Sequence, residues 1–268
     1  METWLSHPAV QAVGLPFIVA LIVALPLART RWLAIAQVAG FAVCATLVAG
    51  WSLEALTSTR KLAIIGIATL ALCALVEVGS SNWRAAAATS AVALGFAAAW
   101  MLWRLLAQKE IGPALLAALL AAGYVVLQAG LSLHAGADPV RSTAAGAVLA
   151  LATGAVAILG ASAVLGSMAI AVGVSAVATL VLPWLRNEAP PRGRSIALPV
   201  SAVAALGDVA AVLVAELPGY CLVPLALVFP VSHLAPALRP VRTRAAVAFA
   251  LALIPAAAAI ALAWFRPA

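Results

Sequence analysis

STAAGAVLALATGAVAILG, residues 142–160, is followed after three residues by VLGSMAIAVGVSAVATLVLPWL, residues 164–185. Neither segment contains a charged side chain. A helix needs about 20 apolar residues to cross a hydrocarbon layer roughly 30 Å thick, and both segments have that length. Because backbone groups in lipid must be hydrogen-bonded within their own segment, each segment is predicted to be a transmembrane helix.

The same composition extends through the whole chain. Of its 268 residues, 66% are hydrophobic and 9% are charged, and the mean hydropathy is +1.17. A soluble domain carries roughly 45–50% apolar and about 25% charged residues. The sequence therefore predicts an all-α, polytopic transmembrane bundle. It excludes a disordered chain, a disulfide scaffold and a water-soluble catalytic domain.

Charged or Gly/Pro/Ser-rich breaks divide the chain into about ten apolar runs joined by short loops. Because the breaks near 160–164 and 218–219 carry no charge, nine spans remain an alternative. A break at 134–141 separates two predicted halves of one membrane domain, 1–133 and 134–268, with five spans each, which is compatible with an inverted repeat. The runs are 9–28, 32–51, 62–78, 85–103, 111–133, 142–160, 164–185, 196–217, 219–237 and 245–265.

The basic residues lie in the connections between these runs, so the formal net charge of +7 does not indicate a nucleic-acid partner. With ten spans, the odd-numbered connections hold ten basic residues, whereas the even-numbered ones and the C-terminus hold five. Cytoplasmic loops carry the excess of Lys and Arg. We therefore expect both termini outside, in a bacterial cytoplasmic (inner) membrane, with the lipid bilayer and a small solute or ion as partners.

Small residues dominate the spans between Thr143 and Val181, with spacings such as Ser162/Gly166 and Ala169/Gly173. Such spacings let helix backbones approach closely. We expect tight packing within the chain, and the alternative is a contact face for a homo-oligomer or another membrane subunit.

Asp208 is the most informative polar residue. It lies near the middle of run 196–217, in the sequence AALGDVAA of residues 204–211. An ionisable side chain inside a span is costly and is a functional candidate by default. Because burial disfavours the charged carboxylate, Asp208 could bind and release a proton. The alternative is a neutral side chain that hydrogen-bonds a neighbouring helix.

Two glutamates are further candidates for solute or ion binding. Glu216 follows Asp208 by eight residues, which places it about 80° around the helix and roughly 12 Å along it. Glu77 ends the run 62–78. Either residue could instead mark the boundary of its span at the membrane surface.

His233 lies in a run that prolines interrupt at a spacing of six: Pro218, Pro224, Pro230 and Pro236. Proline lacks the N–H that a helix needs, so this segment is predicted to be kinked or discontinuous. Broken helices in membranes line cavities or are buried in protein, and their freed backbone groups can bind substrates and ions. Tyr220 and Ser232 share the segment and could add polar contacts. The alternative is a kinked packing helix whose histidine is hydrogen-bonded.

Cofactor and metal motifs are absent from the sequence. It contains no GxxxxGK[ST], HExxH or CxxC, and its three histidines are scattered. We expect no nucleotide, metal or other cofactor. The three cysteines, Cys44, Cys73 and Cys221, lie in apolar runs and are expected to be buried.

Two short patterns are similar to those of known membrane hydrolases. Trp83-Arg84, then Gly160-Ala161-Ser162 and then His233 resembles the order of motifs in rhomboid proteases, but Ala163 replaces the glycine expected after the serine. Gly207-Asp208, followed by Pro218-Gly219 and then His233, resembles the Gly-Asp and later polar positions of the lysoplasmalogenase-like hydrolases. Those proteins have a second acidic site, which Glu77 matches only in part. These resemblances imply hydrolysis within the membrane.

The favoured interpretation is a permease for a small solute or ion, in which Asp208 binds a proton or cation and the two halves rock to give alternating access. One alternative is a membrane-embedded enzyme that acts on a lipid or isoprenoid, with Asp208 and His233 as an acid/base pair. The other is a non-catalytic subunit that anchors a larger complex.

Overall fold

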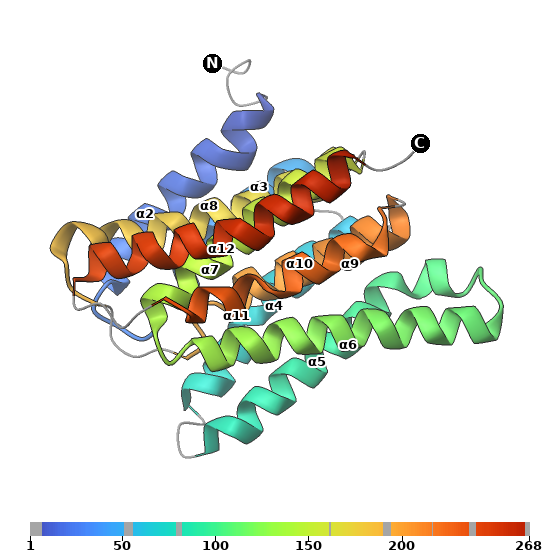
Figure 1. Ribbon diagram of the computed structural model, residues 1–268, viewed down its shortest axis with the longest axis horizontal. Helices are drawn as coiled ribbons and strands as arrows, with labels where there is room; N and C mark the ends of the chain where they lie inside the picture. The colour runs from blue at the N-terminus through green and yellow to red at the C-terminus, as the bar shows by residue number, and fades with distance from the viewer. Residues whose placement is uncertain are drawn as a thin grey trace.

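The described part of the chain is entirely helical. The computed structural model describes residues 7–50, 56–78, 82–160, 162–189, 194–215, 217–235 and 240–265. In these ranges every regular element is a helix and no strand occurs. The helices run roughly side by side in one bundle (Figure 1). The all-α prediction is confirmed for these residues.

Within the described ranges, seven helices are long and apolar enough to cross a membrane. They are η1 and α2 taken together (Val10–Gly14 and Leu15–Leu27), α4 (Ser58–Val78), α5 (Trp83–Leu106), α6 (Ile111–Ala135), α7 (Pro139–Leu159), α8 (Ala163–Arg186) and α12 (Val241–Trp264).

Three further apolar segments are shorter: α3 (Ala34–Ala49), α9 (Leu198–Val214), and the group η3 (Gly219–Cys221), α10 (Leu222–Ala226) and α11 (Val228–His233). These ten segments overlap the ten apolar runs of the sequence. The count of ten membrane spans is not confirmed, however, because α3 and α9 have 16 and 17 residues, fewer than the about 20 that span a bilayer.

The segment after α9 is discontinuous, as its prolines predict. A 3₁₀ turn at Gly219–Cys221 precedes α10, which ends at Ala226. Leu227 forms a turn, and α11 begins at Val228. Pro224 and Pro230 cannot donate backbone hydrogen bonds, so neither can extend a regular ladder through this region.

Helices α7 and α9 lie at the centre of the bundle. Helix α7 packs against α8, α9 and α12, while α9 also contacts α4, α6 and α8. Close approach of α7 and α8 depends on glycine, because a Cβ added at Gly154 would lie 2.9 Å from the carbonyl oxygen of Gly166. The small residues in these helices therefore make contacts within one chain. The main apolar core contains residues of both predicted halves.

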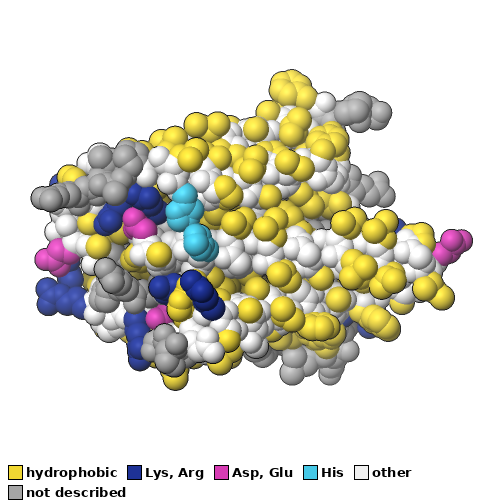
Figure 2. Space-filling model, turned by 60° about the horizontal axis from the view of Figure 1, so that its bottom comes forward, with side chains coloured by type: hydrophobic (Ala, Val, Ile, Leu, Met, Phe, Trp, Pro, Cys, Tyr) yellow, Lys and Arg dark blue, Asp and Glu magenta, His cyan; other side chains and the backbone are white. Residues whose placement is uncertain are grey.

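One end of the bundle carries most of the described charged side chains, and we call it the charged end. There the Arg31 guanidinium donates to the backbone carbonyl of Glu77, and the Arg194 guanidinium lies 3.9 Å from the ring centroid of Trp83. Figure 2 shows Lys/Arg, Asp/Glu and His side chains gathered at this end, with hydrophobic side chains over most of the remaining surface of that face. The opposite end holds Lys61, whose ammonium donates to the carbonyl of Trp100.

Candidate functional site

Asp208 lies in the interior of the bundle, where α9 is enclosed by α4, α6, α7 and α8. Its side chain is 1% exposed. The hydroxyl of Tyr124, on α6, donates a 2.7 Å hydrogen bond to Oδ2 of Asp208. A buried carboxyl is tolerated only when it is neutral or hydrogen-bonded, and Tyr124 supplies one of the bonds it needs.

A second polar side chain extends this contact to the broken segment. Gln128 follows Tyr124 by four residues, so the two share one face of α6. Its Nε2 donates to the Tyr124 hydroxyl at 3.1 Å and to the carbonyl of Leu225 at 3.2 Å. Leu225 lies in α10, two residues before the turn at Leu227. The polar network therefore connects α9, α6 and the discontinuous segment.

Oδ1 of Asp208, Oε1 of Gln128 and Oγ1 of Thr153 are buried beside this network and form no well-aligned hydrogen bond with a described residue. The Thr153 hydroxyl is nevertheless close enough to the Asp208 carboxyl to interact with it. Thr153 lies on α7 next to α9, since a Cβ added at Gly207 would lie 3.2 Å from its methyl carbon. Unpartnered buried polar atoms are rare in folded proteins. Oxygen ligands suit protons and hard cations, so the arrangement has unused capacity to bind either.

A groove of about 530 Å³ reaches the network from the side. It lies between α6, α9 and the start of the broken segment, and its lining includes Leu120, Tyr124, Val209 and Leu213. Tyr124 is the residue that belongs to both the groove and the network. Helix α6 comes from the predicted first half, and α9 and α10 come from the second. The site thus combines helices from both sides of the predicted division at 133/134.

His233 is not close to Asp208. It is exposed at the charged end, where its ring centroid lies 6.1 Å from that of His134. His134 follows Tyr124 by ten residues on α6, a separation of about 15 Å along the helix. The structure therefore does not form the acid/base pair that the enzyme hypothesis requires.

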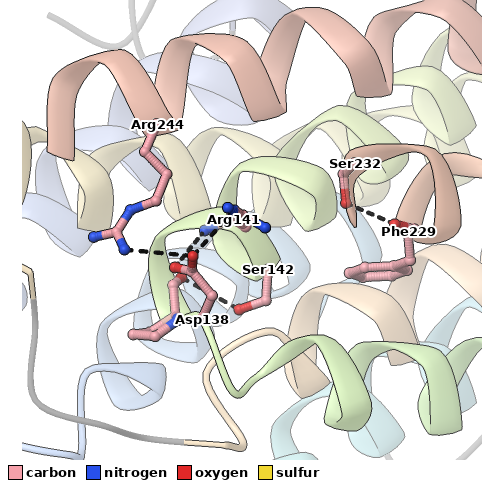
Figure 3. A network of polar contacts seen from close by, with 7 residues as sticks. Asp138, Arg141, Ser142, Phe229, Ser232 and Arg244 are labelled. Carbon is pink, nitrogen blue, oxygen red and sulfur yellow. Dashed lines mark hydrogen bonds and ion pairs between the residues drawn. The ribbon is translucent and has the colours of Figure 1, made fainter. Parts of the chain in front are cut away.

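An ion-pair network around Asp138 lies near His233, and Figure 3 shows its members. Oδ2 of Asp138 is 3.1 Å from Nε of Arg141 and 3.5 Å from Nη1 of Arg244. Ser232 is drawn in the same view, and its hydroxyl donates to the carbonyl of Phe229 in its own helix at 2.7 Å. Because that bond occupies the hydroxyl proton, Ser232 stabilises α11 locally and is separate from the Asp208 network.

The remaining predicted site residues are dispersed. Glu77 lies at the charged end, where its Oε1 accepts hydrogen bonds from the backbone N–H of Ser195 at 2.9 Å and from the Ser195 hydroxyl at 2.8 Å. Tyr220 is 47% exposed on the 3₁₀ turn. Glu216 lies outside the described residues. Of the five predicted residues that the structure describes, Asp208 alone belongs to the buried network.

Tyr124, Gln128 and Thr153 were not predicted as site residues. A signal for two of them is present in the sequence, because Tyr124 and Gln128 are polar residues spaced by four in the apolar run 111–133. That spacing places both on one face of a helix. Thr153 has no comparable signal, since threonine in a span commonly bonds its own helix.

The described residues contain no group of three or more His, Cys, Asp or Glu side chains that could hold a metal ion. Comparisons with protein-family models, with curated proteins and with solved structures gave no match.

Proposed function

We propose that this chain is an integral membrane permease for a small solute or ion, coupled to a proton or cation through Asp208. The observation that carries the proposal is the 2.7 Å hydrogen bond between Tyr124 and Asp208. It joins the two predicted halves inside an apolar bundle and leaves Oδ1 of the same carboxyl unpartnered. The other proposed partner is the lipid bilayer.

The geometry supports a simple coupling step. A charged Asp208 accepts a hydrogen bond from Tyr124 and needs a second favourable contact at Oδ1. A proton on Oδ1, or a cation beside it, provides that contact and removes the cost of a buried charge. Relative movement of α6 and α9 would break the Tyr124 contact and change access to the carboxyl, which is how binding energy shifts a two-state equilibrium.

A lipid-acting enzyme is the second candidate, and the apolar groove favours it. The groove ends at Tyr124, so an isoprenoid or acyl chain in it would reach the polar network. In that case Tyr124 and Asp208 would have to supply the acid/base chemistry without His233. A structural subunit of a larger complex needs neither the groove nor the unpartnered oxygen.

The test is the accessibility of position 208 from each side of the membrane. Cys44, Cys73 and Cys221 are replaced with Ala, Asp208→Cys is introduced, and the protein in oriented vesicles is treated with a membrane-impermeant thiol reagent from either side. Ala210→Cys is the matched control, because residue 210 is buried and points about 200° away from residue 208 around α9.

Labelling of position 208 from both sides, with position 210 unlabelled, supports a permease with alternating access. Labelling from one side only supports an enzyme pocket. If neither side is labelled in a protein with wild-type size and melting temperature, both functions are contradicted and a structural subunit is the better account.

A further inference from the structure

A second groove lies on the opposite side of α7 from the Asp208 network. It has a volume of about 530 Å³ and runs between α8 and α12, with Ala144 of α7 among its lining residues. Helix α12 packs mainly against α7 and touches α8 little, so a hollow remains between the two. Small side chains on α12, including Ala246 and Ala250, face Val177 and Val181 of α8 across it.

Two arginines, Arg186 and Arg242, lie near the end of this groove that is at the charged end of the bundle. Trp184 and Leu185 line the groove, and their backbone carbonyls accept hydrogen bonds from Nε of Arg242 at 2.8 Å and from Nη2 at 2.9 Å. These bonds fix the Arg242 guanidinium at the last turn of α8. Arg186 is the next residue after Leu185 and is exposed; it lines a neighbouring pocket with Arg29 and Glu188, at the same end of α8.

Neither arginine forms an ion pair with a described residue. The ion pairs found among these residues join Arg141 and Arg244 to Asp138. Glu188, the acidic residue closest to Arg186 in the sequence, pairs with neither. The groove therefore has an apolar length and an exposed Trp184 at one end. The Arg242 guanidinium lies beside that end, and Arg186 is the last residue of the same helix. Tryptophan and arginine in this order are typical of a helix end at a membrane surface.

We propose that the groove binds an anionic phospholipid, with one acyl chain between α8 and α12 and the headgroup phosphate at Arg186 and Arg242. Basic pockets between transmembrane helices bind such headgroups. A helix is about 10 Å across with its side chains, so the groove suits a slimmer occupant such as an acyl chain. Since surrounding lipid tails are as apolar as the groove, selectivity comes from the headgroup charge.

The test is native mass spectrometry of the full-length protein, titrated with phosphatidylglycerol or with phosphatidylcholine of identical acyl chains. We expect one phosphatidylglycerol to bind about tenfold more tightly than phosphatidylcholine. Arg242→Gln and Arg186→Gln should each reduce that preference. Ala246→Phe should weaken the binding of both lipids, because the phenyl ring would fill the groove.

Arg104→Gln is the matched control, since Arg104 is exposed at the opposite end of the bundle. Arg186→Gln keeps the proposal testable if Arg242→Gln fails to fold, because the Arg186 side chain forms no hydrogen bond with a described residue, whereas Arg242 bonds the carbonyls of Trp184 and Leu185. Equal binding of the two lipids, or arginine variants that behave like Arg104→Gln, would overturn the proposal. The proposal would also be overturned if Ala246→Phe bound both lipids as the wild type does, or if soluble glycerol phosphate displaced the lipid.

Asp208→Asn should bind phosphatidylglycerol like the wild type, because the lipid groove and the Asp208 network share no residue. This variant separates the lipid proposal from the transport proposal, and either can fail alone.

Discussion

Tyr124 and Asp208 are 84 residues apart in the chain, and the Tyr124 hydroxyl donates a 2.7 Å hydrogen bond to Oδ2 of the buried Asp208 carboxyl. The bond connects a helix of the predicted first half to a central helix of the second. Gln128 completes the contact by donating to both Tyr124 and the carbonyl of Leu225. A hydrogen-bond network of this kind in an apolar bundle specifies how the surrounding helices pack.

Tyr124→Phe is expected to lower the free energy of unfolding by about 1–3 kcal/mol, because it leaves Oδ2 of Asp208 buried without a partner. Denaturant unfolding in detergent, followed by circular dichroism, measures the change. The double variant with Asp208→Asn should be destabilised by less than the sum of the two single variants, since both remove the same bond.

Tyr220→Phe is the control for this cycle, because Tyr220 is 47% exposed and lies outside the network. It should leave the stability unchanged. Strict additivity of the Tyr124 and Asp208 effects would show that the hydrogen bond does not couple them.

Gly154→Ala is expected to destabilise the protein by about 1–3 kcal/mol through overpacking between α7 and α8. The new methyl carbon would lie 2.5 Å from Cγ1 of Ile170 and 2.9 Å from the carbonyl oxygen of Gly166. Gly123→Ala is matched to it, because nothing lies within 4 Å of a Cβ at that position of α6. Melting temperatures of the two variants measure the difference, and equal values would be inconsistent with close packing of α7 and α8.

Glu77 is expected to have a structural role. Glu77→Ala leaves the buried N–H of Ser195 without its acceptor and should cost about 1–3 kcal/mol of stability. Glu77→Gln keeps a side-chain oxygen that can accept from Ser195, so it should retain most of the stability and should leave labelling at position 208 unchanged. Loss of labelling at position 208 in a stable Glu77→Gln protein would instead give Glu77 a part in the transport step.

The three cysteines are expected to be unreactive in the native protein. Cys44, Cys73 and Cys221 are 0%, 2% and 0% exposed. A maleimide reagent should modify none of them before unfolding and all of them afterwards, as counted by intact mass spectrometry. Rapid modification of Cys221 in the native state would indicate that the broken segment opens.

The charge distribution predicts the orientation of the bundle. The charged end should face the cytoplasm, with both chain termini outside, because cytoplasmic loops carry the excess of Lys and Arg. A reporter enzyme that is active only outside the cytoplasm should be active when fused to either terminus and inactive when inserted after Glu188. The reverse pattern would contradict the orientation.

Much of the secondary structure could be predicted from the sequence. Uninterrupted apolar runs indicate helices because lipid leaves no other way to satisfy the backbone, and the prolines at 224 and 230 indicate the break between α10 and α11. Asp208 could be singled out because a charged group in such a run is costly wherever it points. The number of membrane spans could not be predicted as firmly, since α3 and α9 are shorter than the apolar runs that contain them.

The partners of Asp208 depended on tertiary structure. In the sequence, His233 and Glu77 are as plausible as Tyr124 as hydrogen-bond partners of Asp208. Both nevertheless lie at the charged end, because the position of a residue along its helix sets the depth of its side chain in the bundle. Contacts between helices depend on which faces pack together, and runs composed largely of alanine, valine and leucine look alike on every face. Local composition therefore determined that this chain forms apolar helices, whereas the packing of α6 against α9 decided that Tyr124 meets Asp208.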